Sequence, residues 1–195
     1  MAQETYRLKR MARCCAGRRR ILDLGCADMP NPYLANPEVV GLDLADADLP
    51  ANYTDFKRGD VMDLPRPFGP ASFDAIHAGE LIEHLERPVE FLRGCLECLR
   101  PGGIMVLSTP NPNSPIERLL TIPLSRRFFY GKGGVYQPFG HICLYPQRWL
   151  IRILEVAGFT GVKLSSGGFP LPGVGLVPFP RPWCYQTIAE AARPA

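Results

Sequence analysis

Short apolar runs alternate with stretches of helical periodicity along most of the chain. Ile21 to Leu24 is such a run and breaks at Gly25, and Val39 to Leu44 is a second run with an acidic residue near its end. Strands alternating with helices favour an α/β fold with a largely parallel sheet. The expected strands are residues 21–24, 39–44, 56–61, 72–77, 104–108, 159–165 and 185–192.

The helical pattern predicts four helices around these strands. Residues 2–17 can form an amphipathic helix, and residues 78–85 begin a helix directly after the fourth strand. Residues 88–99 repeat apolar side chains at helical spacing, and so do residues 146–157, for which Gly158 is the expected C-terminal cap. The long proline- and glycine-rich stretch at 110–140 interrupts the alternation.

Three aspartates lie at the carboxyl ends of expected strands, where open α/β sheets bind ligands. Asp23, just before the Gly25 turn, would repel a phosphate but suits an ammonium group. Asp43 is placed to accept hydrogen bonds from both hydroxyls of a ribose. The Asp60 carboxylate could accept from the exocyclic amine of adenine while the Val61 amide donates to the ring. The pattern indicates a nucleotide-like cofactor with positive charge, although Asp-x-Gly alone also fits an ordinary strand-to-helix turn.

Composition narrows the class of protein. The chain has 195 residues, 46% of them hydrophobic, which is enough for one domain with a full core. A net charge of +3 makes no case for nucleic acid. Seven cysteines without a disulfide spacing, no signal peptide and no membrane-length apolar run predict a reduced, cytoplasmic setting. Cys95 and Cys98 are interpreted as buried helix cysteines.

The order of motifs is more specific than any one of them. The segments are ILDLGCA, GLDL, GDVMDLP, SFDAIHAGELIEHLERP, LRPGGIMVLSTPNP and LEVAGF, over residues 20–165. In this order and spacing the chain resembles class I S-adenosylmethionine-dependent methyltransferases. The resemblance implies a Rossmann-like fold: a seven-stranded, mostly parallel sheet with helices on both faces and an antiparallel last strand. We expect a single domain over residues 1–195.

The same resemblance implies S-adenosylmethionine as the cofactor. Asp23 and Gly25 would lie beside its methionine part, Asp43 on its ribose and Asp60 on its adenine. The full set of implied contacts is Asp23, Gly25, Cys26, Ala27, Asp43, Leu44, Asp60, Val61, Ala78 and Gly79. The family's Asp-x-Gly-x-Gly-x-Gly is altered here, because Ala27 and Met29 replace the second and third glycines. A nicotinamide cofactor is disfavoured, because Gly25, Ala27 and Pro30 do not form its Gly-x-Gly-x-x-Gly turn.

An acidic-histidine cluster follows the fourth strand. On a helix, Glu80, Glu83 and His84 share one face and could hold a divalent cation, or Glu83 and His84 could simply pack the helix without metal. Ubiquinone-pathway and small-RNA O-methyltransferases are similar in carrying Glu-x-x-Glu-His here and a later histidine, matched by His141. This similarity implies Mg²⁺ or Mn²⁺ held by Glu80, Glu83, His84 and His141.

The expected activity is O-methylation of a small-molecule, glycan-like or quinone-like acceptor. His84 or His141 is the candidate base, and His77 is interpreted as a residue of the pocket wall. Residues 110–140 are the expected lid, within which residues 116–130 could alternatively touch a membrane surface. Two other functions stay open: a non-catalytic binding protein with this fold, and an RNA 2′-O-methyltransferase, against which the modest charge argues. The acceptor and the oligomeric state are not predicted.

Overall fold

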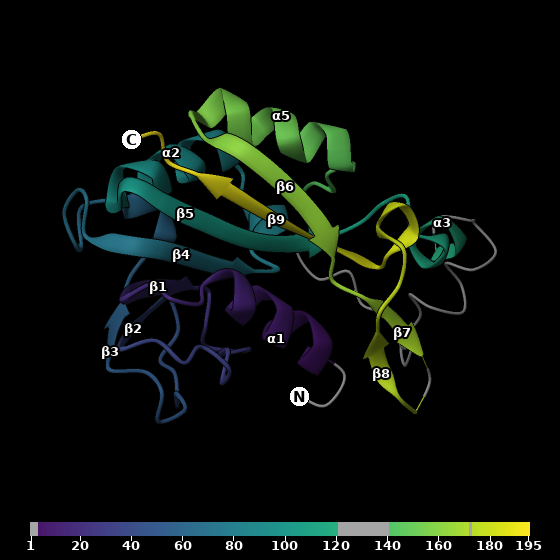
Figure 1. Ribbon diagram of the computed structural model, residues 1–195, viewed down its shortest axis with the longest axis horizontal. Helices are drawn as coiled ribbons and strands as arrows, with labels where there is room; N and C mark the ends of the chain where they lie inside the picture. Colours follow the sequence, from purple (N-terminus) through teal and green to yellow (C-terminus); the bar gives the residue numbers. More distant parts are fainter. Residues whose placement is uncertain (1–3, 121–140, 172) are drawn as a thin grey trace.

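The computed structural model describes residues 4–120, 141–171 and 173–195, and a seven-stranded sheet forms its centre (Figure 1). The spatial order of the strands is β3-β2-β1-β4-β5-β9-β6. The strands are β1 (Arg20–Leu24), β2 (Glu38–Asp43), β3 (Asp55–Arg58), β4 (Phe73–Gly79), β5 (Leu99–Pro110), β6 (Thr160–Ser166) and β9 (Gln186–Ala192). A separate hairpin contains β7 (Phe169–Leu171) and β8 (Gly175–Val177).

The sheet is parallel from β3 to β5, and β9 runs antiparallel to both of its neighbours. This is the mostly parallel sheet with an antiparallel last strand that the resemblance implies, and the prediction is confirmed. Because parallel strands end at the same edge, the turns after β1, β2, β4 and β5 gather at one edge of the sheet.

Helices cover both faces of the sheet. The helix α1 (Thr5–Cys14) lies on one face, and α2 (Pro88–Cys98) and α5 (Gln147–Ala157) lie on the other (Figure 1). Met11 of α1 packs with Ile21 and Val106, whereas Leu92 and Leu150 belong to the core on the opposite face. The apolar stripes predicted for these helices are therefore their buried faces.

Several helix ends match local sequence signals. Gly158 ends α5 with a φ of +110°, a left-handed conformation that glycine adopts without strain. The short helix α3 (Pro115–Leu120) begins after Ser114, whose hydroxyl accepts a hydrogen bond from the Glu117 amide. None of the helices in the described part of the chain combines the length and the apolar character that a membrane crossing requires.

The helix predicted for residues 78–85 is wrong. The strand β4 continues to Gly79 because it still pairs with β5 there, and the Glu80 amide donates to the Ser108 carbonyl at 3.0 Å. Glu80 itself has a φ of +52°, and only a 3₁₀ turn follows, at Ile82–His84. Glu80, Glu83 and His84 therefore do not share the face of a helix.

Two connections also differ in form from ordinary crossovers. No helix forms between β1 and β2, although prolines at 30 and 32 could have opened one, and none forms between β2 and β3. Residues 121–140 lie outside the described residues. Most of the expected lid at 110–140 and of the expected membrane-contact segment at 116–130 falls there, so both stay predictions.

Candidate functional site

A cavity of about 460 Å³ opens at the edge of the sheet where the parallel strands end. Six of the ten residues expected to contact the cofactor line it, and these come from the turns after β1, β2, β3 and β4. The six residues are Gly25, Asp43, Leu44, Asp60, Val61 and Gly79. The remaining lining residues are Asp28, Met29, Glu80, Leu81, His84 and Leu85. Asp23, Cys26, Ala27 and Ala78 are not part of the lining.

Backbone amides fix two of the lining carboxylates in place. The two oxygens of Asp43 accept hydrogen bonds from the amides of Ala27, at 2.9 Å, and Ala45, at 3.0 Å. One oxygen of Asp60 accepts from the Met62 amide at 2.8 Å and caps the 3₁₀ turn Val61–Asp63. A carboxylate oxygen can accept more than one hydrogen bond, so both groups keep acceptor capacity for a ligand. The arrangement suits hydroxyl and amine donors rather than a phosphate.

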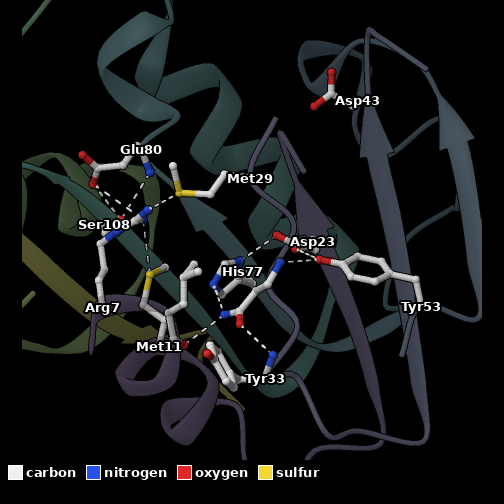
Figure 2. Close-up of polar contacts among 12 residues, drawn as sticks. Arg7, Met11, Asp23, Met29, Tyr33, Asp43, Tyr53, His77, Glu80 and Ser108 are labelled. Carbon is white, nitrogen blue, oxygen red and sulfur yellow. Dashed lines mark hydrogen bonds and ion pairs between the residues drawn. The ribbon is translucent and has the colours of Figure 1, made fainter. Parts of the chain in front are cut away.

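Asp23 lies in a buried polar network instead of on the cavity wall (Figure 2). One carboxylate oxygen is 2.6 Å from Nδ1 of His77, and the other accepts a hydrogen bond from the Tyr53 hydroxyl. Burial beside the Asp23 carboxylate raises the pKa of Tyr53, so the phenol keeps the proton that it donates. His77 is 2% exposed and does not line the cavity, contrary to its interpretation as a wall residue.

Asn31 joins this network to the rest of the domain. Its side-chain amide donates to the Leu8 carbonyl at 3.0 Å and lies 3.1 Å from Nε2 of His77. Its backbone amide donates to the Tyr53 hydroxyl at 2.8 Å. Because the Asn31 amide is a donor, Nε2 of His77 accepts and Nδ1 carries the proton toward Asp23. The non-helical β1–β2 connection is thereby tied to α1, to β4 and to the β2–β3 connection.

Arg7 of α1 has a side chain that is 1% exposed and contacts Met29 and Glu80, which both line the cavity. Its guanidinium donates to the Ser108 hydroxyl at 2.8 Å and contacts the Met29 sulfur at 2.8 Å (Figure 2). It also pairs with Glu4 at 2.7 Å. A Cβ added to Gly79 would come within 2.9 Å of Nη1 of Arg7. Gly79 therefore makes room for this guanidinium at the cavity wall.

Glu80 points toward Arg7 and not toward Glu83. Its carboxylate accepts from the Ser108 hydroxyl at 2.8 Å and from the Gln186 side chain at 3.0 Å, and it lies 3.8 Å from Nη1 of Arg7. Burial raises the pKa of Glu80, while the charge of Arg7 and the two hydrogen bonds oppose that rise.

Three of the four expected metal ligands converge beside the cavity. One ligand atom each from Glu83, His84 and His141 lies within 4.8 Å of the others, and the two imidazole rings meet edge to face. The backbone holds this arrangement, because the amides of Ile142 and Cys143 both donate to the Glu83 carbonyl. Glu80 lies outside the group because its carboxylate is held by Ser108 and Gln186.

The Glu83 carboxyl group is buried in this cluster without a hydrogen-bond partner for either oxygen among the described residues. Burial, and then the nearby Glu80 carboxylate, raise the pKa of Glu83 from 4.5 to about 9. Burial, and then the neighbouring His84, lower the pKa of His141. A buried carboxylate facing two imidazoles is costly as an isolated charge and matches the oxygen and nitrogen donors of a divalent cation. The donor set therefore fits a metal.

Residues 5–164 match the model of a methyltransferase domain. This chain belongs to the methyltransferase domain family. A probable S-adenosylmethionine-dependent methyltransferase of Mycolicibacterium smegmatis is 34% identical over 191 residues, which cover 90% of this chain and 66% of the relative. A ubiquinone biosynthesis O-methyltransferase of Dinoroseobacter shibae is 36% identical over 107 residues, 48% of this chain and 42% of the relative. The chain thus spans just under two thirds of the first relative and less than half of the second.

Solved structures share the fold of this methyltransferase domain. A possible histamine N-methyltransferase of Thermotoga maritima has a TM-score of 0.72 at 13% identity, covering 98% of this chain and 90% of that one. An S-adenosylmethionine-dependent methyltransferase of Archaeoglobus fulgidus has a TM-score of 0.70 at 20% identity, covering 95% and 91%. The family resemblance and the Rossmann-like fold expected from the motifs are confirmed.

Sequence reasoning missed Arg7 in this methyltransferase domain. A signal was present, because Arg7 lies one helical turn before Met11, on the stripe that α1 buries with Leu8, Ala12 and Cys15. A charged residue at such a position needs a buried partner or a ligand. The roles of the lining residues in cofactor binding stay predictions, as does that of Asp23.

Proposed function

We propose that this chain transfers the methyl group of S-adenosylmethionine to a hydroxyl group of a small molecule, and that the acceptor carries adjacent oxygens. The observation that carries the proposal is the cavity itself, which opens between Asp43, Asp60 and Gly79 and has the group of Glu83, His84 and His141 at its side. The similarity to relatives named ubiquinone biosynthesis O-methyltransferase supports a hydroxyl acceptor.

Groups suited to each part of the cofactor lie along the cavity or directly behind its wall. The Asp43 carboxylate is placed to accept from the ribose hydroxyls, and Asp60 with the Val61 amide to bind the adenine edge. The Arg7 guanidinium suits the carboxylate of the methionine part, because a planar fork binds a carboxylate through two parallel hydrogen bonds. Met29, which now contacts Arg7, would have to leave that nitrogen free.

When bound, S-adenosylmethionine supplies a methyl group that is already activated on a sulfonium sulfur, so the protein mainly aligns the acceptor with it. A hydroxyl acceptor must also lose its proton. His141 is suited to accept it, because its lowered pKa keeps the imidazole neutral at neutral pH. Glu83, His84 and His141 are the residues that would hold a divalent cation, and such a cation would supply positive charge that favours loss of the acceptor's proton. The same imidazole nitrogen of His141 cannot bind a cation and accept the proton at once. Proton transfer to His141 and activation by a cation are therefore alternative routes.

The test is transfer of labelled methyl from S-adenosylmethionine to catechol, with phenol as the matched acceptor that has a single hydroxyl. We expect catechol to be methylated faster than phenol, and a chelator to abolish this transfer without changing the affinity for S-adenosylhomocysteine. Chelator-resistant transfer would assign the proton transfer to a histidine and contradict the metal. Intact cofactor binding without transfer to any hydroxyl acceptor would instead favour the non-catalytic alternative.

Arg7→Met is expected to weaken binding of S-adenosylhomocysteine by roughly 10- to 100-fold, the loss of one charged hydrogen-bonded pair of about 1.5–3 kcal/mol. Binding of 5′-methylthioadenosine should not change, because that molecule lacks the amino-acid part. Calorimetry with both ligands measures the contrast. Equal losses for both ligands would show that Arg7 only supports the fold. Arg13→Met removes a charge from an exposed position of the same helix and serves as the control.

A further inference from the structure

A groove separate from the cofactor cavity lies between α1, the end of β6 and the segment that follows β8. Its volume is about 530 Å³, and it shares no lining residue with the cavity. Figure 1 shows the β7–β8 hairpin projecting beside the N-terminal half of α1, on the same side as the end of β6. The residues that line the groove include Tyr6, Arg10, Ser165, Ser166, Phe179 and Arg181.

Arg10 and Arg181 both line this groove, and neither has an acidic partner among the described residues. Nε of Arg10 donates to the Ser165 hydroxyl at 3.3 Å, which orients the fork and leaves its two terminal nitrogens available. Over residues 4–120, 141–171 and 173–195, no carboxylate lies within ion-pair distance of Arg10 or Arg181. Two unpaired positive groups in one concave site attract a negatively charged ligand.

The apolar side of the groove is held in place by packing. Phe179 stacks on Phe169 with ring centroids 4.6 Å apart, which fixes the segment after β8 against β7. Tyr6 packs against Gly168, where an added Cβ would come within 2.9 Å of the tyrosine ring. The hairpin is therefore fitted onto α1, and the groove offers aromatic faces beside its two guanidinium groups.

A single residue connects the groove with the cofactor cavity. The Gln186 side chain donates to Glu80, which lines the cavity, and the Gln186 carbonyl accepts from the Gly167 amide, next to Ser166 in the groove. Both sites thus lie at the same edge of the sheet, on either side of Gln186. The helix α1 lies beside both sites, because Arg7 contacts Met29 and Glu80, which line the cavity, whereas Tyr6 and Arg10 line the groove.

We propose that this groove binds an oxyanion, a phosphate or a carboxylate, that is attached to a flat or apolar body. Guanidinium forks bind the oxygens of such groups in a bidentate way, and the aromatic walls cover the body. Since both sites lie at the same edge of the sheet, next to Gln186, we assign the oxyanion to the end of the methyl acceptor that is remote from its reacting hydroxyl. This last step rests on the proposed methyl transfer, whereas oxyanion binding in the groove does not.

The test is a titration of cofactor-free protein with inorganic phosphate and, separately, with benzoate at constant ionic strength. Arginine Nε–H signals are followed by ¹⁵N nuclear magnetic resonance. We expect saturable shifts of the Arg10 and Arg181 signals with at least one of the two anions. R10Q and R181Q should each weaken binding at least about fivefold, because each removes charged hydrogen bonds to the oxyanion. R13Q removes the same charge from the same helix outside the groove and should leave binding unchanged.

The two anions distinguish the sources of the oxyanion. Saturation by phosphate alone would indicate a ligand that carries a phosphate group. Saturation by benzoate alone would indicate a ligand with a carboxylate on a ring. Saturation by both would show that the groove binds either oxyanion. Non-saturable shifts, or equal binding by the parent protein, R10Q and R181Q, would overturn the proposal. Failure of the proposed function is a separate result, because it shows as loss of S-adenosylhomocysteine binding or of methyl transfer, which this titration does not involve.

Discussion

Asp43→Ala is expected to weaken binding of S-adenosylmethionine on the order of 100-fold or more. A carboxylate that accepts from two ribose hydroxyls makes two charged hydrogen bonds, each of about 1.5–3 kcal/mol, and 1.36 kcal/mol corresponds to a tenfold change. The position of Asp43 supports this magnitude, because its oxygens are already oriented by the amides of Ala27 and Ala45 at the cavity wall. Isothermal titration calorimetry measures the change.

Two controls separate loss of the ribose contact from damage to the loop. Asp46→Ala removes an exposed aspartate three residues further along, which contacts Arg58 at 3.5 Å and does not line the cavity. It should bind the cofactor like the parent protein. Adenine, which lacks the ribose, should bind equally to the parent and to D43A. Unchanged S-adenosylmethionine affinity in D43A would show that Asp43 does not bind the ribose.

The second large effect concerns the dependence of stability on pH in metal-free protein. Between the ordinary pKa of 4.5 and the folded-state pKa of about 9, Glu83 keeps a proton in the folded protein that the unfolded chain has released. Unfolding then releases a proton, so the free energy of unfolding falls as pH rises, by up to about 1.4 kcal/mol per pH unit. The contribution is fully present below pH 4.5 and is lost as pH rises toward 9.

Glu83→Gln should remove this part of the pH dependence, because the amide does not titrate. Urea unfolding of the parent and of E83Q at several pH values measures the difference between the two slopes. Mn²⁺ should stabilise the parent more at high pH than at low pH, since the cation binds the ionised carboxylate and competes with its proton. Parallel slopes for the two proteins, or equal stabilisation of E83Q by Mn²⁺, would contradict the buried acid as a cation site.

Glu86→Gln is the matched control for this series. Glu86 is exposed and lies three residues beyond Glu83, outside the group with His84 and His141. Its substitution should change neither the slope of stability against pH nor the response to Mn²⁺, because its exposed side chain lies outside the buried cluster.

Local sequence patterns were sufficient to predict the strands of the sheet and the helices α2 and α5, which lie on the face opposite α1. Gly25 directly follows β1 and Gly158 directly follows α5, and both glycines adopt positive φ values that the sequence signals. The cavity residues Asp43 and Asp60 were also predictable, because they lie at the ends of strands that must meet at one edge, whereas Gly79 was implied by the family resemblance. Periodicity and strand order carry this part of the information.

Long-range contacts decide what the sequence patterns missed. The segment after β4 reads as a helix, but pairing with β5 extends the strand to Gly79, and Ser108 then holds Glu80 in a left-handed conformation. Arg7 takes its position from Ser108, about 100 residues further along the chain, which no local pattern can reveal. Likewise, His141 meets His84 through backbone hydrogen bonds to Glu83 that depend on the whole fold.

The β1–β2 connection has a consequence for recombining this domain with its relatives. A helix in such a crossover carries its own hydrogen bonds and can be exchanged as a unit, whereas here Asn31 holds the connection through Leu8, His77 and Tyr53, which lie in three other parts of the chain. A chimera that imports a helical crossover would leave the buried polar groups of His77 and Tyr53, which contact Asp23, without the hydrogen bonds of Asn31. Recombination is therefore expected to succeed only when Asn31, Asp23, His77 and Tyr53 are inherited together. The inherited unit is then a set of distant residues and not a contiguous segment.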